Sequence, residues 1–321
     1  MMGNDINNRP LVILTGPTAV GKPELSIRRA KTINGEIISA DALQVYRGMD
    51  IGTAKVTREE MDGVNHYLID VIEPEDEFNV AVFKGMAESA IKEIYQKGKV
   101  PIITGGTGFY IQAVLFNIDF DSDDDNNQEY RRKLQQLVND KGKEYVHFLL
   151  KEKDPESAMS IHPNNTQRVI RALEYYYTTG KKFSSHNKEQ REKTSSYNYL
   201  YFVLNDDRDK LYDRIDSRVE IMFDKGLLAE MQKLIDRGLT RENQSMQAIG
   251  YRELFDFFEN KTSLEEVKEL IKQNSRHYAK RQLTWFRREK EVSWINYPEF
   301  NYSKDEILKY MTDKIKEKGI I

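Results

Sequence analysis

A glycine-rich segment near the start of the chain, GPTAVGK at residues 16–22, constrains the fold more than any other feature. It follows a short apolar run at Pro10–Thr15, typical of a buried strand, and it precedes a helical pattern. Strand, loop and helix in this order, closed by a lysine, are the context that a phosphate-binding loop requires. The glycines let backbone N–H groups turn around an anion, and the helix N-terminus and Lys22 add positive charge. We therefore expect a phosphate site at the end of a buried strand.

The residue after this lysine departs from the phosphate-loop pattern. That position normally holds Ser or Thr, whose hydroxyl binds Mg²⁺, but this chain has Pro23. Proline has neither the hydroxyl nor a backbone N–H, and it biases Lys22 away from helical dihedral angles. Because proline is tolerated in the first turn of a helix, we expect the fold to survive and catalysis to be impaired.

Further apolar runs indicate a sheet around the first strand. They lie at Gly35–Ser39, Tyr67–Val71, Val100–Thr104 and Tyr199–Leu204, and helical patterns such as Val80–Gln96 separate several of them. Near-continuous apolar strands that alternate with helices are typical of a parallel sheet covered on both faces. We predict an α/β fold with a P-loop NTPase-like parallel sheet flanked by helices, a helical insertion domain and a helical C-terminal region.

The alternation of strands and helices is interrupted in the middle of the chain. Residues 119–129 carry six acids and no bases, which predicts a solvated loop, and a more polar helical stretch runs on to about Gly180. Residues 181–198, rich in Lys, Ser, Asn and Glu, predict a linker or mobile loop. The sheet then resumes at Tyr199, and everything after Arg208 has a helical pattern. The predicted domains are a core of residues 1–116 and 199–321 and an insertion of residues 117–198.

Composition restricts where such a chain works and what it binds. Cysteine is absent, which excludes disulfides and thiolate chemistry and fits a reducing cytoplasm, where we expect the protein. The N-terminus lacks the regions of a signal peptide, and no apolar run approaches the roughly 18 residues of a membrane span, so we expect no membrane contact. The net charge is only −3, but residues 272–290 carry seven Lys or Arg against one acid. This basic helix is either a contact for phosphates or a solvated helix face.

Two further segments lie at the carboxyl ends of predicted parallel strands, where open α/β sheets bind ligands. They are SADALQVYRGMDIGTAK at residues 39–55 and TGGTGFY at residues 104–110. The other blocks are GPTAVGK, HYLID at 66–70, QRVIR at 167–171, DRIDSR at 213–218 and KRQLTWFR at 280–287. Taken in chain order, the seven blocks resemble the tRNA dimethylallyltransferase family from residue 11 to about residue 290. Seven ordered blocks are far more specific than a phosphate loop alone.

The resemblance implies transfer of a dimethylallyl group from dimethylallyl diphosphate to N6 of adenosine 37, beside the anticodon of tRNA, with release of diphosphate. The exocyclic amine of adenine is a weak nucleophile, so a nearby carboxylate can accept its proton during attack. Asp41 matches the family's proposed base, and its alternative is to cap the following turn or helix. Thr107 can hydrogen-bond at the reacting centre, and its alternative is a helix N-cap.

The diphosphate leaving group needs preorganised donors for its developing charge. By resemblance, these donors are the phosphate loop and an arginine of the DRIDSR block. Arg214 and Arg218 are equally favoured for this role, and the alternative for either is a charge on the surface of a helix. Mg²⁺ is the implied cofactor, although its usual ligand position holds a proline. The expected diphosphate-binding residues are Gly16, Pro17, Thr18, Ala19, Val20, Gly21, Lys22 and Pro23.

A target adenine inside a stacked anticodon loop must be extracted, and the strand around it must be held. The resemblance implies that a monomer binds the anticodon stem-loop, with the insertion clasping the stem. Arg276 and Arg288 are further candidates for phosphate contacts, whereas we expect Trp285 in the core. The expected tRNA-binding residues are Asp41, Ala42, Leu43, Gln44, Thr107, Gln167, Arg168, Val169, Ile170, Arg171, Lys280, Arg281, Gln282 and Arg287.

Three alternative functions remain open at this point. A nucleotide kinase would share the phosphate loop but would need neither the insertion nor the basic helix. A prenyltransferase acting on free nucleotides would share the loop and the base, but the KRQLTWFR block and the insertion favour tRNA. A tRNA-binding protein that has lost catalysis through Pro23 is the third alternative.

Overall fold

The computed structural model describes residues 9–120 and 125–321, and these form two compact units. We call them the sheet unit, which comprises the chain up to Leu115 together with Ser196–Ile321, and the insertion unit, Phe116–Ser195. The N-terminal segment for which no signal peptide was expected lies outside the described residues, and so do residues 121–124 of the acidic stretch.

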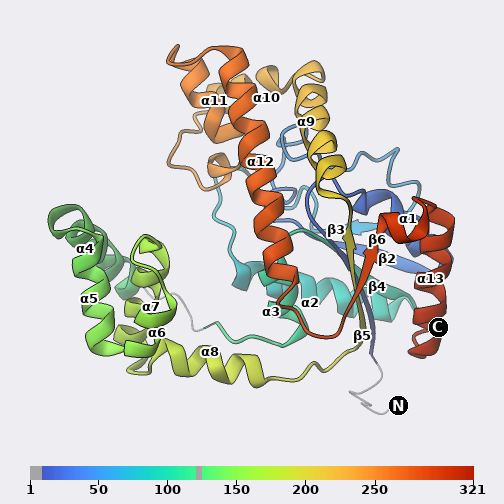
Figure 1. Ribbon diagram of the computed structural model, residues 1–321, viewed down its shortest axis with the longest axis horizontal. Coiled ribbons are helices and arrows are strands. Elements are labelled where there is room, and N and C mark those ends of the chain that lie inside the picture. The colour runs from blue at the N-terminus through green and yellow to red at the C-terminus, as the bar shows by residue number, and fades with distance from the viewer. Residues whose placement is uncertain (1–8, 121–124) are drawn as a thin grey trace. The chain divides into compact units, whose positions relative to one another are not determined.

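A six-stranded sheet forms the centre of the sheet unit, with the order β3-β2-β4-β1-β5-β6 (Figure 1). Every pair of neighbouring strands is parallel. The chain leaves the sheet after its fourth strand and returns from the insertion to pair the fifth strand with the first. The strands are β1 Pro10–Thr15, β2 Gly35–Ala40, β3 His66–Tyr67, β4 Val100–Gly105, β5 Asn198–Asn205 and β6 Val292–Asn296.

Both faces of the sheet are buried because helices cover each of them. Successive side chains of a strand point to opposite faces. Val12 and Leu14 of β1 belong to the cluster that α1 (Lys22–Thr32) and α13 (Lys304–Glu317) complete, while Leu11 and Ile13 are equally buried. Helices α2 (Val80–Gln96) and α3 (Gly108–Leu115) contact each other and the sheet, on the other side in Figure 1. The predicted α/β fold with a parallel sheet is confirmed.

The helices between β5 and β6 form a second layer of the sheet unit, which we call the helical head. Helix α12 packs against α9 and α11, and α10 packs against α9 and α11. Among the described residues, no helix is long and apolar enough to cross a membrane. The head comprises α9 Arg208–Asp224, α10 Leu227–Asp236, the 3₁₀ turn η2 Ser245–Gln247, α11 Tyr251–Phe258 and α12 Leu264–Phe286, and a second 3₁₀ turn, η3 Tyr297–Phe300, follows β6.

The insertion unit is helical and has a core of its own. Leu134, Val146, Leu150 and Leu173 are among the buried residues that pack together there. A buried Asp154 fastens two of its helices, since its carboxylate accepts bonds from both Ser157 and Ser184. Its helices are α4 Asp125–Lys141, α5 Lys143–Lys153, α6 Pro155–Ser160, α7 Thr166–Thr179 and α8 Phe183–Glu192.

Several element predictions were wrong. The run at Tyr67–Val71 contributes only its first residue to a strand, because Leu68 and Asp70 adopt left-handed backbone angles that end pairing. The chain after Arg208 is not all helical, since β6 extends the sheet by pairing with β5. The expected linker at 181–198 contains α8, and the described end of the acidic stretch belongs to α4 rather than to a loop.

Candidate active site

The predicted site segments meet at the carboxyl edge of the sheet, because parallel strands all end on the same side. The phosphate loop follows β1, the Asp41 segment follows β2 and the Thr107 segment follows β4. Hydrogen bonds tie the three together: Thr15 Oγ1 donates to the carbonyl of Gly105 (2.6 Å), and the N–H of Thr107 donates to the carbonyl of Ala40 (3.2 Å). The site is therefore built on neighbouring strand ends.

The phosphate loop has the backbone that its glycines predict. Gly21 has a φ of 92° at the start of α1, and Gly16 lies so close to β5 that an added Cβ would be 2.6 Å from the carbonyl oxygen of Leu204. Lys22 turns back over the loop, where its Nζ donates to the carbonyls of Gly16 (3.0 Å) and Pro17 (2.8 Å). The lysine is thus held by the loop itself.

Two cations share this part of the site. Burial and, to a smaller extent, the neighbouring charge of Arg218 together lower the pKa of Lys22 to about 7, while the charge of Asp41 opposes the shift. Burial also lowers the pKa of Arg218, whose guanidinium donates to Thr18 Oγ1 (3.4 Å). Lys22 and Arg218 are both partly buried, and two positive charges so close together make a site that a multivalent anion would stabilise.

The structure separates the two arginines that the sequence left equal. Arg214 forms an ion pair with Asp206, whose side chain is 0% exposed, and lies over the ring of Tyr297. Arg218, one turn further along α9, reaches the phosphate loop instead. Arg218 is therefore the better candidate for direct contact with diphosphate. Arg214 acts on Arg218 as a neighbouring positive charge.

Pro23 is accommodated in the first turn of α1, as expected. Its carbonyl accepts a hydrogen bond from Ser26 Oγ (2.8 Å), so the turn itself is intact. Pro23 nevertheless offers no hydroxyl, and within residues 9–120 and 125–321 no group of three His, Cys, Asp or Glu side chains could hold a metal. The residues present do not fit a magnesium ion ligated by the chain in the usual way, and its involvement stays a prediction.

Asp41 caps the turn after β2, which is one of the two roles weighed for it, and its role as the base stays a prediction. Its Oδ1 accepts the N–H of Leu43 (3.0 Å), which shapes the turn after β2. Its charge also acts on Lys22, Arg218 and Tyr278, so the carboxylate lies among the charged groups of the site. The same side chain can therefore hold the turn and face a substrate.

Thr107 likewise combines a capping position with a side chain in the site. Its carbonyl accepts the N–H groups of Tyr110 (3.0 Å) and Ile111 (3.3 Å) at the start of α3, while its side chain bonds to Tyr278. Burial, together with the charge of Asp41, raises the pKa of Tyr278 to about 12. Sequence reasoning missed Tyr278, although it lies on the basic helix only two residues before Lys280.

Gln282 has a different place from the one expected. It was predicted to contact tRNA, but it is 5% exposed, and both ends of its amide are engaged within the chain. Its Oε1 accepts the N–H of Thr18 (2.8 Å) and its Nε2 donates to the carbonyl of Gly106 (3.0 Å). An added Cβ on Gly106 would lie 2.1 Å from that nitrogen, which explains the glycine. Gln282 thus braces the phosphate loop against the loop after β4.

The four residues of the segment after β2 are all only partly exposed: Asp41, Ala42, Leu43 and Gln44. The Gln44 amide, proposed to read a base edge, accepts from Ser39 Oγ (3.3 Å). Its Nε2 points to the carbonyls of Thr53 (3.4 Å) and Ala54 (3.5 Å). These bonds are long, so contact with a base would replace weak interactions.

The basic stretch of α12 divides into a paired and an exposed half. Lys272 pairs with Glu220 (2.6 Å), and Arg276 pairs with Asp216 (2.6 Å). The later cations are exposed, and no ion pair is found for them within the described part of the chain. Trp285 packs against Phe109 and Gly108 but is only half-buried, so it does not lie in the core as expected. The exposed cations are Lys280, Arg281, Arg287 and Arg288.

The QRVIR segment lies at the start of α7 in the insertion unit. Gln167 and Arg168 are exposed, and Arg171 is half-buried. Val169 and Ile170 lie in the core of this unit, so their side chains do not support the predicted contact with tRNA. The prediction stays for the other three residues.

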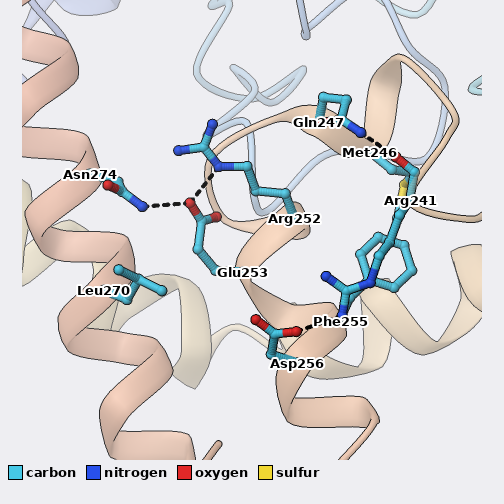
Figure 2. A pocket seen from close by; sticks show the side chains of 9 residues that line it. All are labelled: Arg241, Met246, Gln247, Arg252, Glu253, Phe255, Asp256, Leu270 and Asn274. Carbon is cyan, nitrogen blue, oxygen red and sulfur yellow. Dashed lines mark hydrogen bonds and ion pairs between the residues drawn. The ribbon is translucent and has the colours of Figure 1, made fainter. Parts of the chain in front are cut away.

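One cavity of about 360 Å³ lies away from these residues, between η2, α11 and α12. Figure 2 shows that its charged side chains partner one another: Arg241 pairs with Asp256 (2.7 Å) and Arg252 with Glu253 (2.7 Å). Asn274 also donates to Glu253 (2.8 Å). None of the predicted catalytic residues lines it, so the candidate site stays at the edge of the sheet.

Known proteins resemble this chain over nearly its whole length. The model of the IPP transferase family matches residues 44–289. The chain is 56% identical over 313 residues to the tRNA dimethylallyltransferase of Lachnoclostridium phytofermentans, covering 98% of this chain and 99% of that protein. It is 50% identical to the same-named protein of Bacillus cereus strain AH187, covering 98% of both chains.

Solved structures with the same fold carry related names. A full-length tRNA isopentenylpyrophosphate transferase from Bacillus halodurans superimposes with a TM-score of 0.71 at 46% identity, covering 97% of this chain and 98% of that one. A eukaryotic dimethylallyltransferase acting on tRNA gives a TM-score of 0.77 at 31% identity, covering 90% of this chain and 74% of that one. The fold is therefore the P-loop NTPase-like fold that the sequence predicted, and the chain belongs to the IPP transferase family.

Proposed function

We propose that this chain transfers a dimethylallyl group from dimethylallyl diphosphate to N6 of adenosine 37 in tRNA and releases diphosphate. The relatives named above are tRNA dimethylallyltransferases. The observation that carries the proposal is the juxtaposition of Lys22, Arg218 and Asp41, two cations for a polyanion and one carboxylate for a proton. A monomer acting in the cytoplasm, where tRNA is found, is part of the same proposal.

The phosphate loop and its cations hold the leaving group. N–H groups of residues 18–22, Lys22 Nζ and the Arg218 guanidinium surround the place where negative charge grows as the carbon–oxygen bond breaks. Such preorganised donors are worth about 10²–10³ in rate each. For the Thr18 N–H to reach a phosphate oxygen, it must leave the Gln282 amide that it bonds in this structure.

Asp41 is the proposed base at the other reactant. N6 of adenine attacks C1 of the dimethylallyl group, the C1–O bond breaks, and the N6 proton passes to the carboxylate, so that charge and atoms balance. Thr107, held by Tyr278, orients the amine beside it. General base catalysis of this kind contributes about 10²–10⁴ in rate.

The tRNA is held by residues from several elements. The Asp41–Gln44 segment would surround the extracted base, and Lys280 and Arg281 of α12, with Arg287 directly after it, would contact phosphates of the anticodon stem-loop. Gln167, Arg168 and Arg171 of the insertion unit are proposed as further contacts. Splayed bases and phosphates are the features of RNA loops that proteins recognise, so exposed cations near a base pocket suit this substrate.

The decisive experiment compares the chain with Pro23→Thr and Pro23→Ala. Single-turnover transfer to an anticodon stem-loop with adenosines at positions 36–38 is measured with and without Mg²⁺. We expect Pro23→Thr to be faster by about 10²-fold in Mg²⁺, the worth of one well-placed group in such a site. Pro23→Ala restores only the backbone N–H, so it separates that donor from the hydroxyl.

Each outcome discriminates between functions. Activity in Pro23→Thr alone would make the natural chain a tRNA-binding protein with impaired catalysis. Equal activity in all three would show that the hydroxyl is dispensable here. Absence of transfer from all three folded proteins would contradict the proposal and return attention to a nucleotide kinase or an enzyme of free nucleotides.

A further inference from the structure

A buried glutamate of the helical head grips the backbone of the loop after the Asp41 segment. Glu230 of α10 is 8% exposed. Its Oε2 accepts the N–H groups of Asp50 (2.8 Å) and Ile51 (2.8 Å), and its Oε1 accepts the N–H of Gly52 (3.0 Å). Tyr251 of α11 donates its hydroxyl to the same Oε1 (2.6 Å). One carboxylate thus receives three consecutive backbone N–H groups and a phenol.

A carboxylate suits this arrangement, whereas an amide of the same shape does not. All four partners can donate, and three of them, the backbone N–H groups, can do nothing else. Both oxygens must therefore be acceptors, which an amide of the same shape cannot provide. Hydrogen bonds to a charged group are worth about 1.5–3 kcal/mol each, so the loop is held firmly at this point.

Close packing of Gly52 against Tyr251 also holds the loop against the helical head. An added Cβ on Gly52 would lie 2.5 Å from the ring of Tyr251, which is itself fully buried. The helical head holds the next loop as well, since Gln244 exchanges two hydrogen bonds with the backbone of Phe78 (2.9 and 2.7 Å). The head is thus fastened to loops that follow β2 and β3, not only to its own helices.

The anchored loop leads back to the catalytic segment. Thr53 and Ala54, directly after the gripped residues, offer their carbonyls to the Gln44 amide. Lys55 Nζ crosses the loop to the carbonyl of Tyr46 (2.7 Å) and to Asp50 (2.6 Å). A shift of residues 50–52 would therefore be passed to Gln44 and to the turn that carries Asp41.

We propose that Glu230 is a positioning residue for the transfer reaction: from α10 it holds residues 41–55 so that Asp41 and Gln44 face the adenine. This inference rests on the proposed function, because it gives the segment a substrate to face. Glu230 lies outside the motifs that mark the site, and it acts through the loop rather than on the substrate.

The test is Glu230→Gln, made both in the chain with Pro23 and in Pro23→Thr. Glu36→Gln is the matched control, because Glu36 is also buried (4% exposed) and accepts hydrogen bonds from Tyr67 (2.8 Å) and Lys99 (2.8 Å). Glu36 lies near the start of β2, at the opposite edge of the sheet from the candidate site. Three quantities are measured: the single-turnover rate at saturating stem-loop, the affinity for inorganic diphosphate, and amide hydrogen exchange of residues 41–55.

We expect Glu230→Gln to lower the rate about 10²-fold, as a misplacement of about 1 Å can do, with diphosphate affinity unchanged. Exchange of residues 41–55 should speed up, whereas Glu36→Gln should leave rate and exchange there unaltered. Equal rates for Glu230→Gln and its parent, or a loss shared by the control, would overturn the proposal.

Two further variants serve if Glu230→Gln does not fold. Tyr251→Phe removes one of the four bonds and should give a smaller effect, while Gly52→Ala pushes the loop from Tyr251 and should reproduce the rate loss without touching the carboxylate. If no parent transfers the prenyl group, the proposed function fails, and hydrogen exchange still decides the anchoring: unchanged exchange in Gly52→Ala and Tyr251→Phe overturns it.

Discussion

At the scale of single residues, Asp41 has an observed structural role and a proposed chemical one. Its Oδ1 holds the N–H of Leu43, and its charge reaches Lys22 and Arg218. Asparagine can keep the first role, because its carbonyl oxygen accepts the same bond, but it cannot take a proton from an amine. The pair Asp41→Asn and Asp41→Ala therefore separates the two.

We predict that Asp41→Asn loses about 10²–10⁴ in single-turnover rate while its affinity for the stem-loop stays close to that of the parent. Asp41→Ala should lose the same rate and also some stability, since the N–H of Leu43 loses its acceptor. Rates come from rapid quench and stability from urea unfolding. Turnover retained by Asp41→Asn would remove Asp41 as the base.

Lys22 predicts a pH dependence for diphosphate binding. Its pKa is lowered to about 7 by burial and by Arg218, so the free protein loses this proton as the pH rises through 7. A bound polyanion favours the charged lysine and raises its pKa again, so binding takes up a proton above pH 7. The affinity for diphosphate should then fall by up to about tenfold per pH unit over this range.

Calorimetric titration with inorganic diphosphate between pH 6 and 9, in two buffers of different ionisation enthalpy, measures this proton uptake. Lys22→Met is the control, because the pH dependence that remains in it belongs to diphosphate itself. An identical pH slope in the parent and in Lys22→Met would show that the lysine is charged throughout.

At the scale of elements, α12 has different tasks along its length. Its first basic residues are neutralised by α9 through Glu220 and Asp216. Tyr278 and Gln282 turn into the site, while Lys280 and Arg281 between them are exposed. A helix presents different faces every few residues, so adjacent positions in one motif can brace a loop or meet solvent.

We predict that affinity for the stem-loop falls with salt and that Lys280→Ala and Arg281→Ala each reduce the slope of log K against log salt by about one. Lys272→Ala is the matched control on the same helix, because its ammonium already pairs with Glu220 and Glu269 and should leave the slope unchanged. Filter binding across a salt series measures all four proteins. A flat dependence in the parent would remove α12 from the interface.

The elements also differ in how well the sequence predicts them. Helix α2 was predicted with the bounds it has, Val80–Gln96, because its apolar period is regular and Asn79 caps two N–H groups at its start. Strand β6 was missed, since its five residues become a strand only by pairing with β5. Local signals determine the first kind of element, and a distant partner determines the second.

At the scale of the whole molecule, the chain is one sheet unit interrupted by one helical unit. The insertion unit has its own buried cluster around Val146 and Leu150, so it does not depend on the sheet for a core. The sheet continues after the insertion with β5, which pairs with β1 along six residues from Pro10 to Thr15. Such an arrangement accommodates an insertion without disturbing the strand ends at which the candidate site lies.

The sequence by itself determined the phosphate loop, the parallel α/β core, the family and the segments that carry Asp41 and Thr107. These depend on local rules: glycines where the backbone must turn, apolar runs for buried strands, and short motifs at strand ends. Only the tertiary structure placed Arg218 rather than Arg214 against the phosphate loop, engaged the Gln282 amide within the chain, and brought Tyr278 to Thr107 and Glu230 to residues 50–52. Those roles arise from contacts between residues far apart in the chain, and such contacts exist only once the helices have packed over the edge of the sheet.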